Sequence, residues 1–141
     1  MINAEQFLYR QVSDNFGELN FSPYLPLTLS YGNNSIETLG LLDTGATVNV
    51  MPYQIGLQLG AKWEQQNTSV RLAGNLANLP ACGLLATATV AQFPSIRLAF
   101  AWTQAENVPL ILGQVNFFLE FDVCFFRSQK IFDIRPKKES K

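Results

Sequence analysis

The segment 24–43 constrains the fold of this chain more strongly than any other stretch of the sequence. It opens with apolar residues at every second position, the period expected of a half-buried β-strand: Leu25, Leu27 and Leu29. Residues 32–35, Gly-Asn-Asn-Ser, supply turn chemistry, and residues 36–42 form a second apolar strand. The pattern predicts a β-hairpin whose outgoing strand ends directly at Asp43.

Strand patterns also dominate the rest of the sequence. The ranges that favour strands or short extended segments are 48–51, 68–72, 84–93, 96–102, 108–112, 121–126 and 131–135. The last two form a predicted hairpin across residues 127–130. This predominance of strands predicts an all-β fold in which the sheet closes into a barrel.

Helices and irregular segments take up less of the chain. Residues 53–59 favour a brief helical turn, and residues 114–120 a two-turn helix. The apolar side chains that this helix would bury are Val115, Phe117, Phe118 and Leu119. Residues 4–10 fit either a short helix or an arm, residues 13–17 read as a turn, and residues 73–83 form a long loop.

Size and charge indicate a single globular domain. The chain has 141 residues, of which 48% are hydrophobic and 15% charged, so a disordered state is not expected. We expect an N-terminal arm at 1–20, the domain at 21–136 and a basic tail at 137–141. The net charge of −1 and the lack of a basic stripe argue against a nucleic-acid partner. A solvated tail explains the local positive charge about as well as contact with phosphate or membrane.

The residue types present limit the chemistry. The sequence has no His, which excludes Ser-His-Asp catalysis and leaves carboxylates for acid and base roles. Cys82 and Cys124 stand in apolar surroundings and are predicted to be buried free thiols, and we expect neither a metal nor another cofactor. No secretory leader is evident, and the longest weakly polar run, 81–91, is far below the ~20 residues that span a bilayer. The expectation is a soluble cytoplasmic protein without a membrane partner.

Two short motifs carry the functional interpretation. The first is Leu41-Leu42-Asp43-Thr44-Gly45-Ala46, and its Asp-Thr-Gly core taken alone is more often a turn than a site. The second is Ile111-Leu112-Gly113-Gln114, in which an apolar strand ends at glycine and leads into the predicted helix. Together the motifs resemble those of the retropepsin-like aspartic peptidases, and the resemblance in order and spacing of elements covers residues 24–135.

This resemblance implies a closed β-barrel-like retropepsin (acid protease) fold with one short helix after Gly113. It implies an aspartic endopeptidase in which Asp43 of two chains activates water, because the sequence holds a single Asp-Thr-Gly. The partners implied are a second copy of the chain, as a homodimer, and a peptide or unfolded protein substrate. Thr44 would hydrogen-bond across the dimer axis, and Gly45 would let water and backbone approach the carboxylates.

The same resemblance implies which residues line the substrate cleft: Ala46, Thr47, Gly74, Asn75, Pro109, Leu110 and Ile111. For residues 109–112 a plain core role is an equal alternative. The loop 73–83 takes the place of the flap that closes over substrate. The dimer would use terminal strands, either the N-terminal arm or the hairpin 121–135, whose phenylalanines are core or interface.

The sequence also departs from the family pattern. Many members carry an acidic residue after the Ala of the first motif and an Arg after the Gly of the second, whereas this chain has Thr47 and Gln114. Both charges are missing together, so no charge is left without its partner. Two alternatives stay open: a catalytically weak or inactive domain used for dimerisation or peptide binding, and an unrelated barrel in which Asp43 closes a turn.

Overall fold

The computed structural model describes residues 3–13, 19–72 and 76–138, and the findings below concern these residues. In chain order the strands are β1 (Glu5–Leu8), β2 (Arg10–Ser13), β3 (Leu19–Ser22), β4 (Tyr24–Tyr31), β5 (Asn34–Leu42), β6 (Val50–Met51), β7 (Ser69–Val70), β8 (Ala81–Thr89), β9 (Ile96–Thr103), β10 (Leu110–Leu112), β11 (Phe121–Phe126) and β12 (Ile131–Pro136). The helices are α1 (Tyr53–Gln58) and α2 (Phe117–Glu120), and two 3-10 turns lie at Trp63–Gln65 and Arg127–Gln129.

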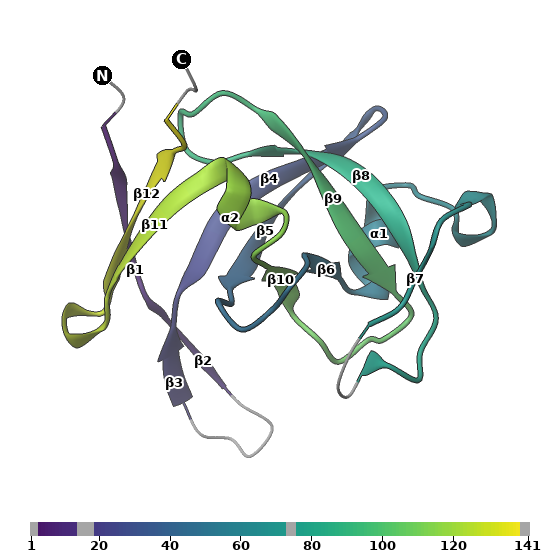
Figure 1. Ribbon diagram of the computed structural model, residues 1–141, viewed down its shortest axis with the longest axis horizontal. Helices are drawn as coiled ribbons and strands as arrows, with labels where there is room; N and C mark the ends of the chain where they lie inside the picture. Colours follow the sequence, from purple (N-terminus) through teal and green to yellow (C-terminus); the bar gives the residue numbers. More distant parts are fainter. Residues whose placement is uncertain (1–2, 14–18, 73–75, 139–141) are drawn as a thin grey trace.

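Six strands form a closed barrel, as the sequence predicted (Figure 1). They follow one another in the order β4, β5, β10, β6, β9 and β8, and β8 returns to β4 through Thr28–Ser30. The hairpin of β4 and β5 is confirmed, with Tyr31 opposite Asn34 at its turn. Within the barrel β10 runs parallel to β5, so the ends of these two strands lie at the same edge.

The chain ends form a second, three-stranded sheet in the order β1, β12, β11 (Figure 1). The helix alternative for residues 4–10 is therefore wrong, because Glu5–Leu8 pair with Ile131–Ile134. The Phe7 ring stacks on the Phe132 ring with centroids 5.5 Å apart, an apolar contact that a separate helix would not make. The predicted turn at 13–17 lies almost wholly outside the described residues, between the paired strands β2 and β3.

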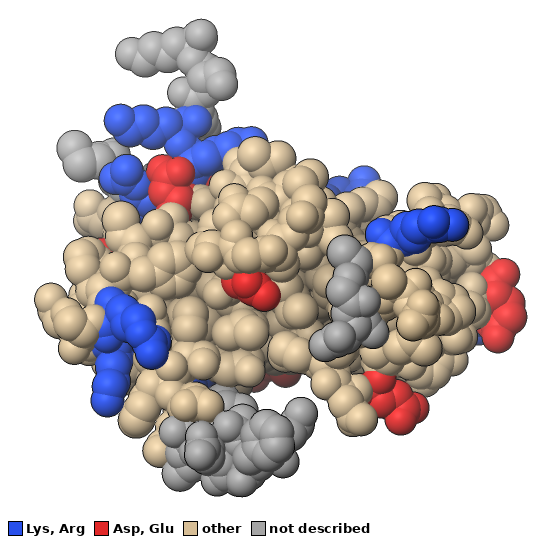
Figure 2. Space-filling model, turned by 60° about the horizontal axis from the view of Figure 1, so that its bottom comes forward, with Lys and Arg blue, Asp and Glu red and all other residues tan. Residues whose placement is uncertain are grey.

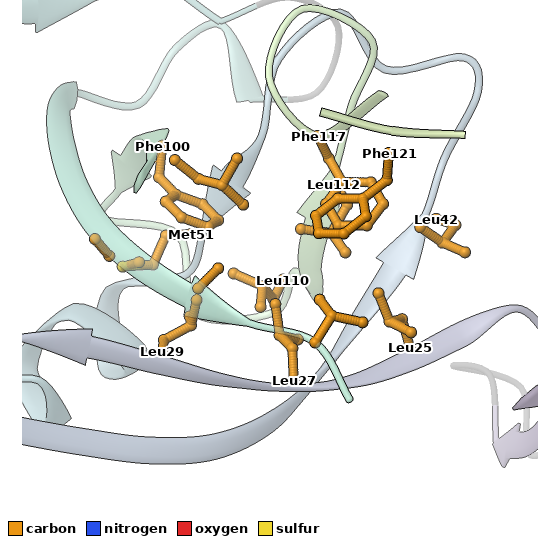
Figure 3. Packing of buried hydrophobic residues seen from close by; sticks show 14 of the residues in the cluster. Leu25, Leu27, Leu29, Leu42, Met51, Phe100, Leu110, Leu112, Phe117 and Phe121 are labelled. Carbon is orange, nitrogen blue, oxygen red and sulfur yellow. The ribbon is translucent and has the colours of Figure 1, made fainter. Parts of the chain in front are cut away.

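The core fills the barrel (Figure 3), and the same cluster includes Phe121, Phe132 and Ile134 of the terminal sheet. The three leucines that alternate along β4 are all buried, as their spacing predicted. Leu110 and Leu112 point into the same cluster from β10, together with Phe117 of α2. Burial of each such side chain stabilises the fold by about 1.5 to 3 kcal/mol. These buried residues therefore hold in place the ends of β5 and β10, which carry the two motifs.

Several elements differ from their predicted extents. The strand expected at 68–72 is limited to Ser69–Val70, and β8 begins at Ala81, within the range expected to be loop. The helix expected at 114–120 covers only Phe117–Glu120. Its first turn is wider than an α-turn, because the Gly113 carbonyl accepts the N–H of Phe118 five residues on.

Three predicted burials are also wrong. Val115 is 48% and Leu119 61% exposed, so the helix region buries Phe117 fully and Phe118 partly. Cys124 is exposed because it alternates along β11 with the inward-facing Val123. Cys82 is buried as predicted, and both thiols are free.

Charged side chains are sparse on the surface seen in Figure 2, where most atoms belong to uncharged residues. Lys and Arg gather at the upper left of that view, toward the chain ends. Two surface ion pairs lie in this end of the chain, Arg135 with Asp122 at 3.3 Å and Lys137 with Glu120 at 3.1 Å. In the part of the chain that the structure describes, no helix has the length and apolar character to cross a membrane.

Candidate active site

Asp43 lies in a turn directly after β5, at the edge of the barrel. Its backbone N–H donates to the Leu112 carbonyl at 3.1 Å, and its own carbonyl accepts the N–H of Ala46 at 3.1 Å, which closes the turn. The side chain is half-buried, and Oδ1 accepts the N–H of Gly45 at 2.9 Å. This arrangement leaves a carboxylate partly open to solvent and fixed by its own loop.

The second motif supports this turn from one side. The N–H of Gln114 donates to the Ala46 carbonyl at 2.9 Å, and the N–H of Val115 donates to the Thr47 carbonyl at 2.7 Å. The Gln114 side chain adds a third bond, from Nε2 to the Thr44 carbonyl at 2.9 Å. The two motifs, seventy positions apart in sequence, therefore form one hydrogen-bonded unit.

Asn49 completes that unit, and sequence reasoning missed it. Its side chain is fully buried, with Oδ1 accepting the Gly113 N–H at 2.8 Å and Nδ2 donating to the Ala99 carbonyl at 3.2 Å. Its own N–H donates to Oδ1 of Asn116 at 2.9 Å. A polar side chain between two valines in an apolar run was the signal available in the sequence, because such a residue is buried only when its hydrogen bonds are made.

Gly113 is required by the close approach of the two segments. A Cβ atom at this position would lie 2.5 Å from the Val48 carbonyl oxygen and 3.0 Å from that of Ala46. Both contacts are with backbone atoms, which cannot move aside as a flexible side chain can. The glycine of the second motif therefore lets the two loops touch.

The residues predicted beside Asp43 in the catalytic loop, and those predicted to line the cleft, differ in exposure. Thr44, Gly45, Thr47 and Pro109 are exposed, and Ala46 and Ile111 are half-buried. Leu110 is only 2% exposed and belongs to the core, the alternative that the sequence left open for it. Gly74 and Asn75 lie outside the described residues, as does the part of the expected flap that they occupy.

A cavity of about 690 Å³ lies away from Asp43, between β3 and the β11–β12 connection. Its lining residues are Asn20, Phe21, Ser22, Arg127, Ser128 and Lys130. The amine of Lys130 sits 4.1 Å from the centre of the Phe21 ring, a cation–π contact. We assign the candidate site to Asp43 because its loop brings a carboxylate, exposed backbone and both motifs together.

The barrel and the joined motifs define a retropepsin-like fold. The structure is similar to that of a retropepsin-like aspartic protease from Rickettsia conorii, with a TM-score of 0.60 and 12% identity over 95% of this chain and 93% of that one. It is also similar to the EIAV protease in complex with the inhibitor HBY-793, with a TM-score of 0.48 and 20% identity over 72% of this chain and 88% of that one. No protein-family model matches the sequence, and no curated protein matches it. At 12% identity the first similarity shows the fold alone.

Proposed function

We propose that the protein is an aspartic endopeptidase, active as a homodimer in which two Asp43 carboxylates share one water molecule. The observation that carries this proposal is the Asp43 turn, in which the half-buried carboxylate accepts the Gly45 N–H and the second motif holds the backbone of the turn. The retropepsin-like fold, shared with a protein described as an aspartic protease, supports the same reading.

The chemistry requires two carboxylates in different protonation states. Two facing carboxylates share one proton, so the ionised group takes a proton from water while the protonated group supports the developing oxyanion. No covalent intermediate and no metal is needed for this step. Since the reaction uses a singly protonated pair, we expect activity to be highest at acidic pH.

The second carboxylate must come from another chain. The sequence contains one Asp-Thr-Gly, and neither Asp122 nor Asp133 is followed by that pattern. A two-fold axis between two Asp43 turns would bring exposed Thr44 and Gly45 of both copies together. Ala46, Thr47, Pro109 and Ile111 would then line a cleft for peptides with apolar side chains beside the cleaved bond.

The test compares Asp43→Asn with Asp133→Asn, a matched change in β12 away from the turn. We expect Asp43→Asn to unfold at nearly the wild-type temperature but to lose at least about a thousandfold in cleavage of an unfolded protein. Asp133→Asn should keep both properties, and a pepstatin-type mimic of the transition state should inhibit the wild type. Full activity in Asp43→Asn would exclude the mechanism, and a dimer that binds peptides without cleaving them would be a binding module instead.

A further inference from the structure

Gln114 and the Asp43 carboxylate are hydrogen-bonded to the two ends of one peptide group. The carbonyl of Thr44 accepts a hydrogen bond from Nε2 of Gln114 at 2.9 Å. The N–H of Gly45, the other end of the same peptide unit, donates to Oδ1 of Asp43 at 2.9 Å. A peptide unit is planar, so a bond that fixes its oxygen also fixes the direction of its N–H.

We propose that Gln114 is a positioning residue that orients the catalytic carboxylate by holding the Thr44–Gly45 peptide plane. This inference rests on the proposed function, because it assigns Gln114 a part in that reaction. Among the described residues, the hydrogen bonds of Gln114 go to Thr44 and Ala46 and not to Asp43. Its contribution is made through the Gly45 N–H.

The other bonds between the motifs do not restrain this peptide directly. The N–H groups of Gln114 and Val115 bond to Ala46 and Thr47, and a residue of any type at these positions makes such backbone bonds. The bond to Thr44 needs a side chain with a donor and enough length, which the glycine before it and Val115 after it lack. Oδ1 of Asn116 is engaged by the N–H of Asn49 instead.

A neutral donor suits this place. Asp43 is the one titratable side chain of residues 41–51, and Glu120, the one of residues 108–120, pairs with Lys137 at 3.1 Å. A cation at position 114 would favour the ionised form of a nearby carboxylate, which opposes the sharing of one proton between two of them. An amide donates at every pH and adds no charge. With Thr47 and Gln114 in place of an acidic residue and an arginine, no ion pair can form between these two positions. The Gln114 amide links the motifs by a neutral hydrogen bond instead.

The decisive variants are Gln114→Met and Gln114→Glu. Methionine keeps the length of the side chain and removes the donor, so kcat should fall roughly three- to tenfold with KM little changed at every pH. Glutamate removes the donor only when ionised. Its deficit should be at least that of methionine at neutral pH, because the ionised carboxylate also repels the Thr44 carbonyl oxygen. The deficit should shrink below the ordinary pKa of about 4.3, where the protonated carboxyl donates again. Gln54→Glu, an equal charge change on the exposed face of α1, serves as the control and should match the wild type.

A second measurement does not depend on catalysis. The Gly45 amide proton resonance should move as Asp43 ionises, because this N–H bonds to its carboxylate. In Gln114→Met the size of that movement should fall at least about twofold, since the peptide plane is no longer held. An unchanged kcat in Gln114→Met, an unchanged Gly45 titration, or a Gln114→Glu deficit that is the same at all pH values would overturn the inference. A wild type without activity would refute the proposed function while the Gly45 titration still decides the role of Gln114.

Discussion

The Oδ1 atom of Asn49 accepts the N–H of Gly113 at 2.8 Å and so ties the segment that follows the first motif to the glycine of the second. The bond is buried, and the other end of the same amide donates to Ala99 in β9. One side chain thereby connects the Asp43 segment, the glycine of the second motif and the barrel wall. We expect the stability of the site to depend on it.

Asn49→Ala should lower the free energy of unfolding by about 1 to 3 kcal/mol, because the buried N–H of Gly113 and the Ala99 carbonyl both lose their partner. Urea unfolding followed by circular dichroism measures this difference. Asn107→Ala, on an exposed bend, is the control and should stay within about 0.5 kcal/mol of the wild type. Equal stability of the two variants would show that water replaces the Asn49 bonds.

Gly113→Ala and Gly45→Ala test the close approach of the two loops. At Gly113 a Cβ meets the backbone of Val48 at 2.5 Å, and we expect a loss of about 2 to 3 kcal/mol. At Gly45 the nearest atom is Oδ1 of Asp43 at 3.3 Å, so Ala should cost less than about 1 kcal/mol. Thermal unfolding of both variants decides between them, and a tolerated Gly113→Ala would contradict the packing described here.

The proposed dimer is tested by mixing the wild type with Asp43→Asn. If both carboxylates are needed, a ninefold excess of the inactive chain should reduce the activity per wild-type chain roughly tenfold, because nearly every wild-type chain then has an inactive partner. Diluting the wild type alone should also lower its specific activity. Activity that stays proportional to the wild-type concentration in both experiments would mean that one chain is sufficient.

The two free thiols should differ in reactivity and in their effect on stability. Exposed Cys124 should react with an aromatic disulfide reagent at least about a hundredfold faster than buried Cys82. Burial raises the pKa of the Cys82 thiol above its ordinary value of 9.0, because desolvation penalises the thiolate. The folded state then favours the protonated thiol. The stability that the folded protein gains from a protonated Cys82 is therefore complete below pH 9, and it is lost as the pH rises through the folded pKa.

Comparison of the wild type with Cys82→Ala isolates this effect. The difference in free energy of unfolding between the wild type and Cys82→Ala should be constant at lower pH. Above pH 9 the wild type should lose stability relative to Cys82→Ala. Cys124→Ala should show no such dependence on pH. A constant difference for Cys82→Ala up to pH 10.5 would mean that Cys82 is solvated in the folded state.

Local pattern was enough to predict the parts of the fold whose partners lie close in sequence. The hairpin of β4 and β5 follows from alternating leucines and a four-residue turn, and its register needs no distant contact. The motif around Asp43 and the strand ending at Gly113 were also recognisable, because each is a short run of fixed residue types. Their hydrogen bonds to each other, and the role of Asn49 between them, depend on contacts that no local pattern encodes.

The errors come from long-range pairing. Residues 5–8 take their structure from β12, more than a hundred positions later, so their own helix propensity does not decide the outcome. Residues 114–116 form a wide turn because they join the Asp43 segment, which shortens the helix and exposes Val115. The outward position of Cys124 follows from which face of β11 packs on the core, information that two isolated cysteines do not contain.

The parallel pairing of β10 with β5 also determines when the site can form. Its contacts join segments about seventy positions apart in sequence, so forming them costs the conformational entropy of closing that loop. Only after this closure can the second motif form its hydrogen bonds to the Asp43 turn. During synthesis, a chain that ends before residue 110 carries Asp43 without Leu112, Gly113 or Gln114 to hold the turn. The Asp43 loop is therefore expected to be among the last parts of the molecule to acquire its native shape, after the leucine hairpin that leads into it.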